Sequence, residues 1–174
     1  YLIGPQYFIF RDEFQYVPPK VVKEAVSQIL ICMGGSDPFH FTEKILTYLD
    51  NSQLNQQLTI IVGASSPLDA SSIETLLENY QGDYRFVKNC NNMAEEFAKS
   101  DIAIIKIGLL KYETALMGLP AITISNNSFH EEIMHNFAKY QTIIHIGSGN
   151  EIGQEALLSA VSGLMDDYEL RKQL

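Results

Sequence analysis

The chain has 174 residues, 46% hydrophobic and 19% charged, which is enough to bury the core of one domain of ordinary size. Its formal net charge of −9 at pH 7 argues against a binder of duplex nucleic acid, because neutralising phosphates requires a basic face. No apolar run reaches the length of a membrane span. The two cysteines, Cys32 and Cys90, lack the spacing of metal ligands and favour reduced thiols in a cytoplasmic protein.

Residues 1–19 are predicted to be irregular, because prolines stand near both ends of the segment, in Gly4-Pro5 and Pro18-Pro19. We interpret the segment as an interdomain linker that docks on the following domain, residues 20–174, with its aromatic side chains covering apolar surface. Those side chains are Tyr7, Phe8, Phe10, Phe14 and Tyr16. Because the first residue is Tyr1 rather than methionine, we expect the chain to be a piece of a longer protein.

From residue 28 onward, short β-branched runs alternate with segments of helical period. Strands are predicted at 28–33, 58–62, 84–87, 102–105, 121–125 and 142–145. Helices are predicted at 39–49, 68–79, 93–99, 110–117, 129–140 and 151–165, and residues 166–174 close the chain. Strand–helix alternation repeated in this way predicts a doubly wound α/β domain.

Several predicted strands are apolar on successive residues, as in Ile29-Leu30-Ile31 and in the run 102–105. Continuous apolarity over a short run indicates that both faces are buried, which is typical of a parallel sheet flanked by helices. The predicted fold class is therefore α/β, Rossmann-like, with a parallel six-stranded sheet and helices on both faces. Such sheets bind ligands beyond the carboxyl ends of their strands, where the strand order reverses.

The first candidate site is the turn at residues 34–38, Gly-Gly-Ser-Asp-Pro, which follows the first strand. Asp37 is predicted to cap the next helix and Pro38 to occupy its first position. Unpaired N–H groups at such a turn, together with the positive end of the helix dipole, suit a phosphate. We expect a positive φ at Gly35, so that a larger side chain there would block the ligand. The alternative is that Gly34 and Gly35 only turn the chain.

The second candidate is the segment 106–120, in which a strand ends at Lys106, the chain turns at Gly108 and a helix carries Glu113 in its early turns. Gly118 is predicted to end that helix. An acidic side chain holds the ribose hydroxyls in dinucleotide-binding folds, and Glu113 is placed to do the same. The alternative is that Glu113 only complements the N-terminus of its helix, which contributes at most about 1 kcal/mol.

Together these segments give the chain a resemblance to the UDP-sugar hydrolase of pseudaminic acid biosynthesis. The related spore-coat polysaccharide proteins share the pattern, and the chain is more distantly similar to the N-acetylglucosaminyl transferase of peptidoglycan synthesis. The resemblance implies the two-domain glycosyltransferase-B fold, with this chain as its C-terminal, nucleotide-binding half. The motifs that carry it are 4–7 (Gly-Pro-Gln-Tyr), 11–14 (Arg-Asp-Glu-Phe), 34–38, 93–95 (Met-Ala-Glu), Tyr112-Glu113 and 118–120 (Gly-Leu-Pro).

The same resemblance implies that the turn 34–36 lines the cleft for the nucleotide diphosphate and that Glu113 holds the ribose hydroxyls. It also implies that the loop before Met93 lies near the uracil. The chain departs from the family at two places. Residues 107–110, Ile-Gly-Leu-Leu, replace a second Gly-Gly-Ser/Thr turn, and Phe129-His130 stands where the family commonly has Asn-Gln.

Lys106 and Lys111 flank the altered turn and are expected to supply positive charge in place of the missing hydroxyl donors, unless both are simply solvated. His130 and His135 stand five residues apart, whereas the zinc motif needs four, so no metal site is predicted, and no cofactor. His145 is interpreted as a hydrogen-bonded core residue. The residues predicted to bind substrate are Gly34, Gly35, Ser36, Asp37, Lys106, Gly108, Glu113 and His130.

These features predict the UDP-binding half of a nucleotide-sugar hydrolase or related transferase in the biosynthesis of bacterial surface sugars of the pseudaminic acid type. The expected partners are a UDP-sugar and an N-terminal domain outside this chain. In the family resembled, that domain carries the catalytic histidine, so no catalytic residue is predicted here. Two alternatives remain: a glycosyltransferase with another acceptor, and a non-catalytic domain whose degenerate cleft contacts other proteins.

Overall fold

The computed structural model describes residue 4, residues 7–18 and residues 20–174. The predictions that involve Tyr1, the Pro5-Gln6 part of the opening motif and Pro19 lie outside the described residues. In the part of the chain that is described, no helix combines the length and the apolar character that crossing a membrane requires.

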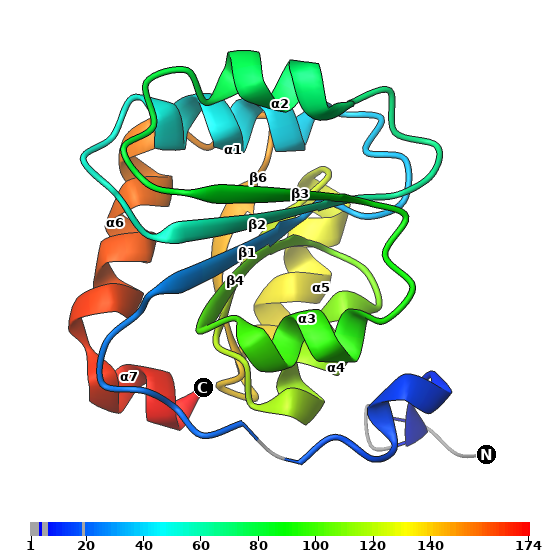
Figure 1. The fold of residues 1–174 in the computed structure, drawn as a ribbon. Coiled ribbons are helices and arrows are strands. Elements are labelled where there is room, and N and C mark those ends of the chain that lie inside the picture. The colour runs from blue at the N-terminus through cyan, green and yellow to red at the C-terminus, as the bar shows by residue number, and fades with distance from the viewer. Residues whose placement is uncertain (1–3, 5–6, 19) are drawn as a thin grey trace.

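Six strands form one parallel sheet in the order β3-β2-β1-β4-β5-β6 (Figure 1). This confirms the predicted α/β fold class with six parallel strands. The order reverses between β1 and β4, so the carboxyl ends of these two strands flank the point where doubly wound sheets bind ligands. The strands are β1 Gln28–Cys32, β2 Gln57–Val62, β3 Tyr84–Lys88, β4 Ile102–Lys106, β5 Ala121–Ser125 and β6 Ile143–Ser148.

Helices cover both faces of the sheet (Figure 1). Helices α1, α2 and α6 lie on one face, and α3, α4 and α5 lie on the other, as the predicted burial of both strand faces requires. The helices are α1 Phe41–Asp50, α2 Ala70–Leu76, α3 Met93–Lys99, α4 Leu110–Met117, α5 Ser128–Ala138, α6 Gln154–Asp166 and α7 Tyr168–Gln173, and Asp12–Phe14 form a short 3-10 turn.

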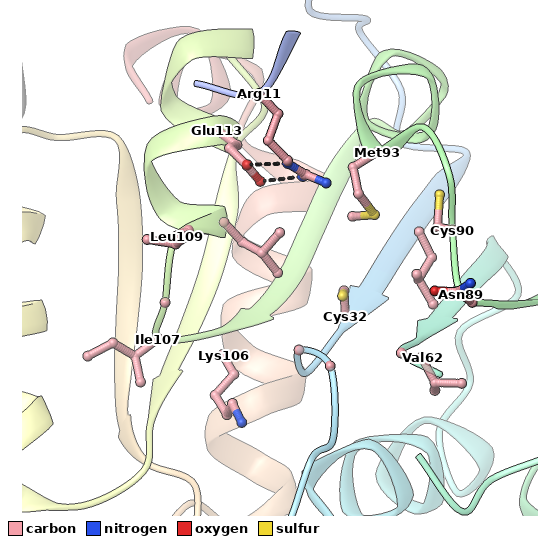
Figure 2. Close-up of a pocket in the computed structure, with 16 residues that line it drawn as sticks. Arg11, Cys32, Val62, Asn89, Cys90, Met93, Lys106, Ile107, Leu109 and Glu113 are labelled. Atoms are coloured by element: carbon pink, nitrogen blue, oxygen red, sulfur yellow. Dashed lines mark hydrogen bonds and ion pairs between the residues drawn. The ribbon is translucent and has the colours of Figure 1, made fainter. Parts of the chain in front are cut away.

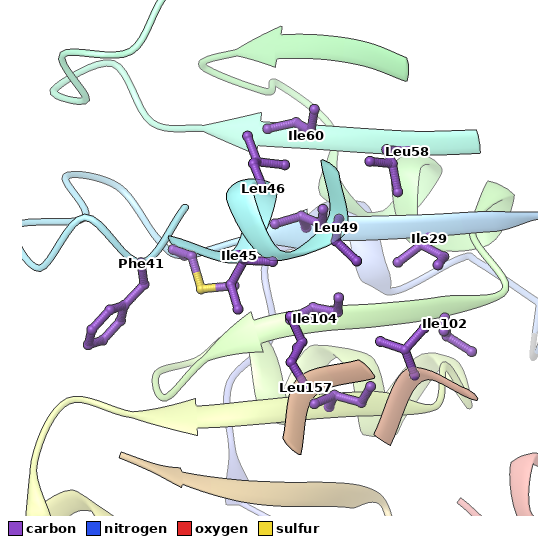
Figure 3. Packing of buried hydrophobic residues seen from close by; sticks show 14 of the residues in the cluster. Ile29, Phe41, Ile45, Leu46, Leu49, Leu58, Ile60, Ile102, Ile104 and Leu157 are labelled. Atoms are coloured by element: carbon purple, nitrogen blue, oxygen red, sulfur yellow. The ribbon is translucent and has the colours of Figure 1, made fainter. Parts of the chain in front are cut away.

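Each face of the sheet has its own apolar cluster, because successive side chains of a strand point to opposite faces. Ile29 and Ile31 belong to the cluster with α1 and α6, in which Leu49 and Leu157 are fully buried (Figure 3). Leu30 of the same strand belongs to the opposite cluster, with α3, α4 and α5. Each fully buried side chain of this size contributes roughly 1.5–3 kcal/mol to the free energy of folding.

The start of α1 corrects one prediction. Asp37 is not its N-cap residue, and Pro38 is not its first residue; His40, with φ 55°, precedes the helix, which begins at Phe41. The Asp37 carboxylate nevertheless accepts hydrogen bonds from the backbone N–H groups of Phe41 at 3.2 Å and Thr42 at 2.7 Å. The Asp37 side chain thus reaches past residues 38–40 to the start of the helix. The prediction assumed that the capping residue directly precedes the helix, and so it missed this arrangement.

The last strand is longer than predicted. β6 continues to Ser148, which pairs with Ser125, and its register with β5 shifts between Thr123 and Ser125. Gly147 adopts a φ of 105°, a conformation that favours glycine and accompanies such irregularities. Residues 146–148 therefore belong to the strand, whereas the predicted strand ended at residue 145.

The described part of the N-terminal segment packs against α3 and α4. Phe14 is buried, with its ring centroid 5.9 Å from that of Phe97 in α3. Phe8 stacks on Tyr112 of α4, with the two ring centroids 4.4 Å apart. Tyr16 is exposed, so only some of the aromatic side chains cover the domain.

Asp101, which directly precedes β4, stabilises the amino end of the sheet. Its buried carboxylate accepts hydrogen bonds from the backbone N–H groups of Ser27 and Gln28, at 2.8 and 3.0 Å, and pairs with the Lys23 ammonium at 2.8 Å. Burial by itself would raise the pKa of Asp101, but the ion pair and the hydrogen bonds hold this pKa below its ordinary value.

This pKa predicts acid sensitivity. The folded state binds the Asp101 proton less tightly than the unfolded chain, so the stabilisation is complete above the ordinary pKa of 3.8 and is lost as the pH falls through the folded-state value. Asp101→Asn should lower the free energy of unfolding by about 1–3 kcal/mol at pH 7. Urea unfolding at pH 7 and at pH 3 should show this difference shrinking in acid; a difference that stays constant would contradict the assignment.

Arg171 of α7 is fully buried and anchors the carboxyl end of the chain. Its guanidinium donates hydrogen bonds to the backbone carbonyls of Leu164 and Met165 in the last turn of α6. It also donates to the carbonyls of Lys23 and Glu24, at 2.9 and 2.7 Å. The charge is therefore satisfied by four carbonyl dipoles, two of them at the negative end of a helix.

Candidate functional site

A cleft of about 440 Å³ opens at the carboxyl edge of the sheet, over β1 and β4, where the strand order reverses (Figure 2). Its walls come from the β1–α1 turn, the end of β2, the β3–α3 loop, the β4–α4 turn and the N-terminal segment. Five predicted site residues line it: Gly34, Gly35, Lys106, Gly108 and Glu113. Ser36, Asp37 and His130, which are also described, are not among its lining residues.

The two glycines of the β1–α1 turn have different surroundings. Gly34 has a φ of 91°, and a Cβ atom there would lie 3.8 Å from the Lys106 ammonium. Gly35 has no such φ, and a Cβ atom on it would have open space, so the positive φ predicted at Gly35 is wrong and belongs to Gly34. The turn rests on Gly63, where a Cβ atom would lie 2.1 Å from the Gly35 carbonyl oxygen.

Gly63 therefore fixes the position of the turn. Gly63→Ala should push the Gly35 backbone away and lower the free energy of unfolding by about 1–3 kcal/mol, the usual cost of overpacking. Gly35→Ala is the matched control, because its new methyl group has open space and should change stability by less than about 0.5 kcal/mol. Urea denaturation of the two variants measures both values. Equal stability of the two variants would show that the turn is free to move.

Glu113 is held by a residue from the N-terminal segment. Nε and Nη2 of Arg11 donate to the two carboxylate oxygens of Glu113, both at 2.9 Å, and the Glu113 side chain is only 3% exposed (Figure 2). Burial by itself would lower the pKa of Arg11, but the hydrogen bond and charge of Glu113, with the charge of Glu13, raise it above its ordinary value. The pair thus places one buried carboxylate and one guanidinium at the wall of the cleft.

The two lysines beside the altered turn have different roles. Lys106 lines the cleft, and its ammonium makes no hydrogen bond or ion pair with the residues that the structure describes. Lys111 is buried outside the cleft: it donates to the Gly108 carbonyl at 2.9 Å and lies 4.3 Å from the Tyr112 ring centroid. Burial lowers the pKa of Lys111. Of these two lysines, only Lys106 is thus placed to meet an anion in the cleft.

Helix α4 begins at the cleft without a side-chain cap. Leu109, its N-cap residue, has no side chain that can accept a hydrogen bond, so N–H groups of the first turn are left for another partner. At the start of α1, by contrast, the Asp37 carboxylate already uses the N–H groups of Phe41 and Thr42. The positive helix end that remains available to an anion is therefore that of α4 rather than α1.

The loop between β3 and α3 forms the far wall. Asn89 adopts a φ of 56°, and its backbone N–H donates to the Val62 carbonyl at 2.8 Å, which ties the loop to β2. Cys90 and Met93 follow along this wall, opposite Cys32. Burial raises the pKa of both thiols, that of Cys32 to about 11, so both are protonated at neutral pH and neither is suited to act as a nucleophile.

None of the four histidines lines the cleft. His130 is in the first turn of α5, where its backbone N–H donates to the Asn127 side chain at 3.1 Å. His145 lies in β6, and its Nδ1 is 3.0 Å from the Thr123 carbonyl, so the predicted hydrogen bond is present; the residue is only half-buried on the edge strand, however, and is not part of the core. Burial lowers the pKa of His145. Among the described residues, no group of three or more His, Cys, Asp and Glu side chains is placed to hold a metal ion.

Two residues that the sequence did not single out for the site are central to it. Arg11 belongs to the 11–14 motif, whose importance rested only on a family resemblance, and its partner is 102 residues away. Gly63 follows β2, so its place at the carboxyl edge was predictable, but its contact with Gly35 was not. The available signal for Arg11 was that it is the only lysine or arginine in residues 1–19.

Comparison with known proteins yields a family and several relatives. The model of the glycosyltransferase family 28 C-terminal domain matches residues 29–144. The spore coat polysaccharide biosynthesis protein SpsG of Bacillus subtilis (strain 168) is 26% identical over 174 residues, which cover 98% of this chain and 51% of SpsG. The uncharacterized protein MJ1062 of Methanocaldococcus jannaschii is 27% identical over 152 residues, which cover 84% of this chain and 31% of MJ1062.

Two solved structures share the fold. MurG of Acinetobacter baumannii superimposes with a TM-score of 0.69 at 15% identity, covering 93% of this chain and 47% of MurG. WaaG, a glycosyltransferase involved in lipopolysaccharide biosynthesis, superimposes with a TM-score of 0.62 at 20% identity, covering 84% of this chain and 40% of WaaG. The chain thus spans about half of the length of SpsG and less than half of either solved protein.

Proposed function

Because the chain belongs to the family of glycosyltransferase family 28 C-terminal domains, we propose that it is the nucleotide-binding half of an enzyme that hydrolyses or transfers the sugar of a UDP-sugar. One observation carries the proposal: a glycine turn, a lysine without a partner among the described residues and a buried carboxylate line a single cleft at the switch point of the sheet. Doubly wound sheets bind nucleotides at this place.

The phosphates of the nucleotide are assigned to the side of the cleft between Gly34 and α4. There the backbone of the glycine turn, the Lys106 ammonium and the uncapped start of α4 offer positive charge and hydrogen-bond donors. Such donors would stabilise the negative charge that develops on the departing nucleotide when its bond to the sugar breaks. This is the chemistry that a sugar hydrolase and a sugar transferase have in common.

The nucleoside is assigned to the part of the cleft between Glu113 and the loop 89–93. Glu113 accepts the ribose hydroxyls, and the loop 89–93 contacts the base, as the family resemblance implies for uracil. No residue of this chain is assigned as a catalytic base. We place that group in an N-terminal domain, and residues 1–19 are the linker to it; the match to about half of SpsG supports this division.

The biological context that we propose is bacterial surface-polysaccharide biosynthesis, with a sugar of the pseudaminic acid type. The spore coat polysaccharide name of SpsG supports the first part, and the motif resemblance supports the second. A cytoplasmic location is part of the proposal and is in keeping with two free thiols, Cys32 and Cys90, beside the cleft.

Isothermal titration of the chain with UDP, CMP and GDP tests the proposal. We expect UDP to bind most tightly, and its affinity to fall with added salt because Lys106 attracts the phosphates. Lys106→Met should weaken UDP binding by about tenfold or less and reduce the salt dependence, whereas Lys44→Met, on α1 outside the cleft, should change neither. Folded protein that binds none of the three nucleotides would overturn the proposal.

A second candidate function rests on the altered turn. Leu109 is 64% exposed beside the cleft, where the family resemblance predicts a hydroxyl donor, so the surface there is apolar. This feature favours a non-catalytic domain that contacts another protein through a degenerate cleft. Absence of nucleotide binding, together with normal folding, would favour this second candidate.

A further inference from the structure

A row of four contacting groups of alternating charge extends across the cleft from α4 to α3. The Glu113 carboxylate of α4 holds Arg11, and Nη1 of Arg11 lies 3.2 Å from Oε1 of Glu13. The same Oε1 accepts a hydrogen bond from the backbone N–H of Met93, at the positive N-terminus of α3, at 2.9 Å. The N-terminal segment thus connects the two helices that form the walls of the cleft.

This connection is anchored on both sides of Arg11. Phe14 is buried against Phe97, and Phe8 stacks on Tyr112, the neighbour of Glu113. The Arg11 guanidinium also lies 5.2 Å from the Phe14 ring centroid. A side chain held in this way loses little further conformational freedom when a ligand binds, so its geometry is preorganised.

The Arg11 contact leaves hydrogen-bonding capacity on Glu113. An ionised carboxylate has about four acceptor positions, and the guanidinium fork uses one on each oxygen. Because a planar fork fixes both oxygens at once, it also fixes the direction in which the remaining acceptor positions point. Glu113 lines the cleft, and because its side chain is almost fully buried, its carboxylate is held in a single orientation.

We propose that Arg11 is the positioning residue for ribose recognition: its guanidinium holds the buried Glu113 carboxylate in the orientation that accepts the 2′- and 3′-hydroxyls of a nucleotide. The inference rests on the proposed nucleotide-binding function and deepens it. It makes the N-terminal segment part of the binding site, although only one of its charged groups contacts Glu113.

The test compares UDP with 2′,3′-dideoxy-UDP by calorimetry, in the unmodified chain and in Arg11→Met. The unmodified chain should bind UDP at least about tenfold more tightly than the dideoxy analogue, whereas in Arg11→Met the ratio should fall to about one or two. Arg11→Lys should give an intermediate ratio, because an ammonium keeps the charge but cannot hold both oxygens.

Arg85→Met is the matched control, because Arg85 also pairs with a glutamate, Glu96, but lines no part of the cleft. It should leave the ratio unchanged. If Arg11 only holds the N-terminal segment against the domain, Arg11→Met will weaken the binding of both nucleotides equally. The affinity ratio would then stay the same, which would overturn the inference. Tighter UDP binding by Arg11→Met would overturn it as well, because Arg11 would then obstruct Glu113. A folded chain that binds neither nucleotide would instead overturn the proposed function.

Discussion

Glu113→Ala is expected to weaken UDP binding by at least about tenfold. A carboxylate that accepts two ribose hydroxyls makes charge-assisted hydrogen bonds of roughly 1.5–3 kcal/mol each before the cost of desolvation, and each 1.4 kcal/mol is a factor of ten in affinity. Glu96→Ala is the control: Glu96 is a buried glutamate paired with an arginine, but it lies outside the cleft. Its removal should leave UDP affinity unchanged.

A thermodynamic cycle that combines Glu113→Ala with 2′,3′-dideoxy-UDP identifies the contact that is lost. The dideoxy analogue should bind the unmodified chain about as weakly as UDP binds Glu113→Ala, and the two losses should not add, because each removes the same contact. Calorimetric titration of both nucleotides against both proteins gives the four affinities. Fully additive losses would mean that Glu113 acts only as a charge at the start of its helix.

Arg171→Met is expected to have the largest effect on stability. Methionine fills similar space but leaves four backbone carbonyls without their charged donor, at the end of α6 and at residues 23–24. Hydrogen bonds to a charged group contribute roughly 1.5–3 kcal/mol each, less when they share a donor, so we expect a total loss of about 3–5 kcal/mol in the free energy of unfolding. Urea denaturation measures this loss against the total of roughly 5–15 kcal/mol that is usual for a domain.

The neighbouring Lys172 provides the control for this prediction. Its ammonium pairs with Glu169 at 3.2 Å on the surface, in the same helix α7. Such an exposed pair contributes only about 0–1 kcal/mol, so Lys172→Met should be nearly neutral. A similar small effect of Arg171→Met would show that solvent or other donors satisfy the four carbonyls.

The fold was predictable because its signals are local. Runs such as Ile29-Leu30-Ile31 need only their own composition to indicate a strand that is buried on both faces. Gly118, with a φ of 63°, ends α4 where the sequence placed the stop. The start of α1 was not predictable, because Asp37 caps it across an intervening turn.

The candidate site was only partly predictable, because its decisive contacts join residues far apart in the chain. The edge of the sheet and the turns at Gly34 and Lys106 follow from strand order and glycine placement. The pairing of Arg11 with Glu113 spans 102 positions, and nothing in either motif specifies it. His130 was placed in the site because it stands where the resembled family commonly has Asn-Gln, and the structure puts it outside this cleft.

NMR mapping of UDP binding on the chain shows directly whether the nucleotide occupies the cleft at the switch point. We expect UDP to shift the backbone amide signals of Gly34, Gly108 and Cys90, around the cleft at the switch point. A second groove, of about 430 Å³, lies beside α2 and includes Ser71 and Thr75, whose signals should not move. Shifts confined to that groove, or no shifts at saturating UDP, would show that the cleft at the switch point is not the UDP site.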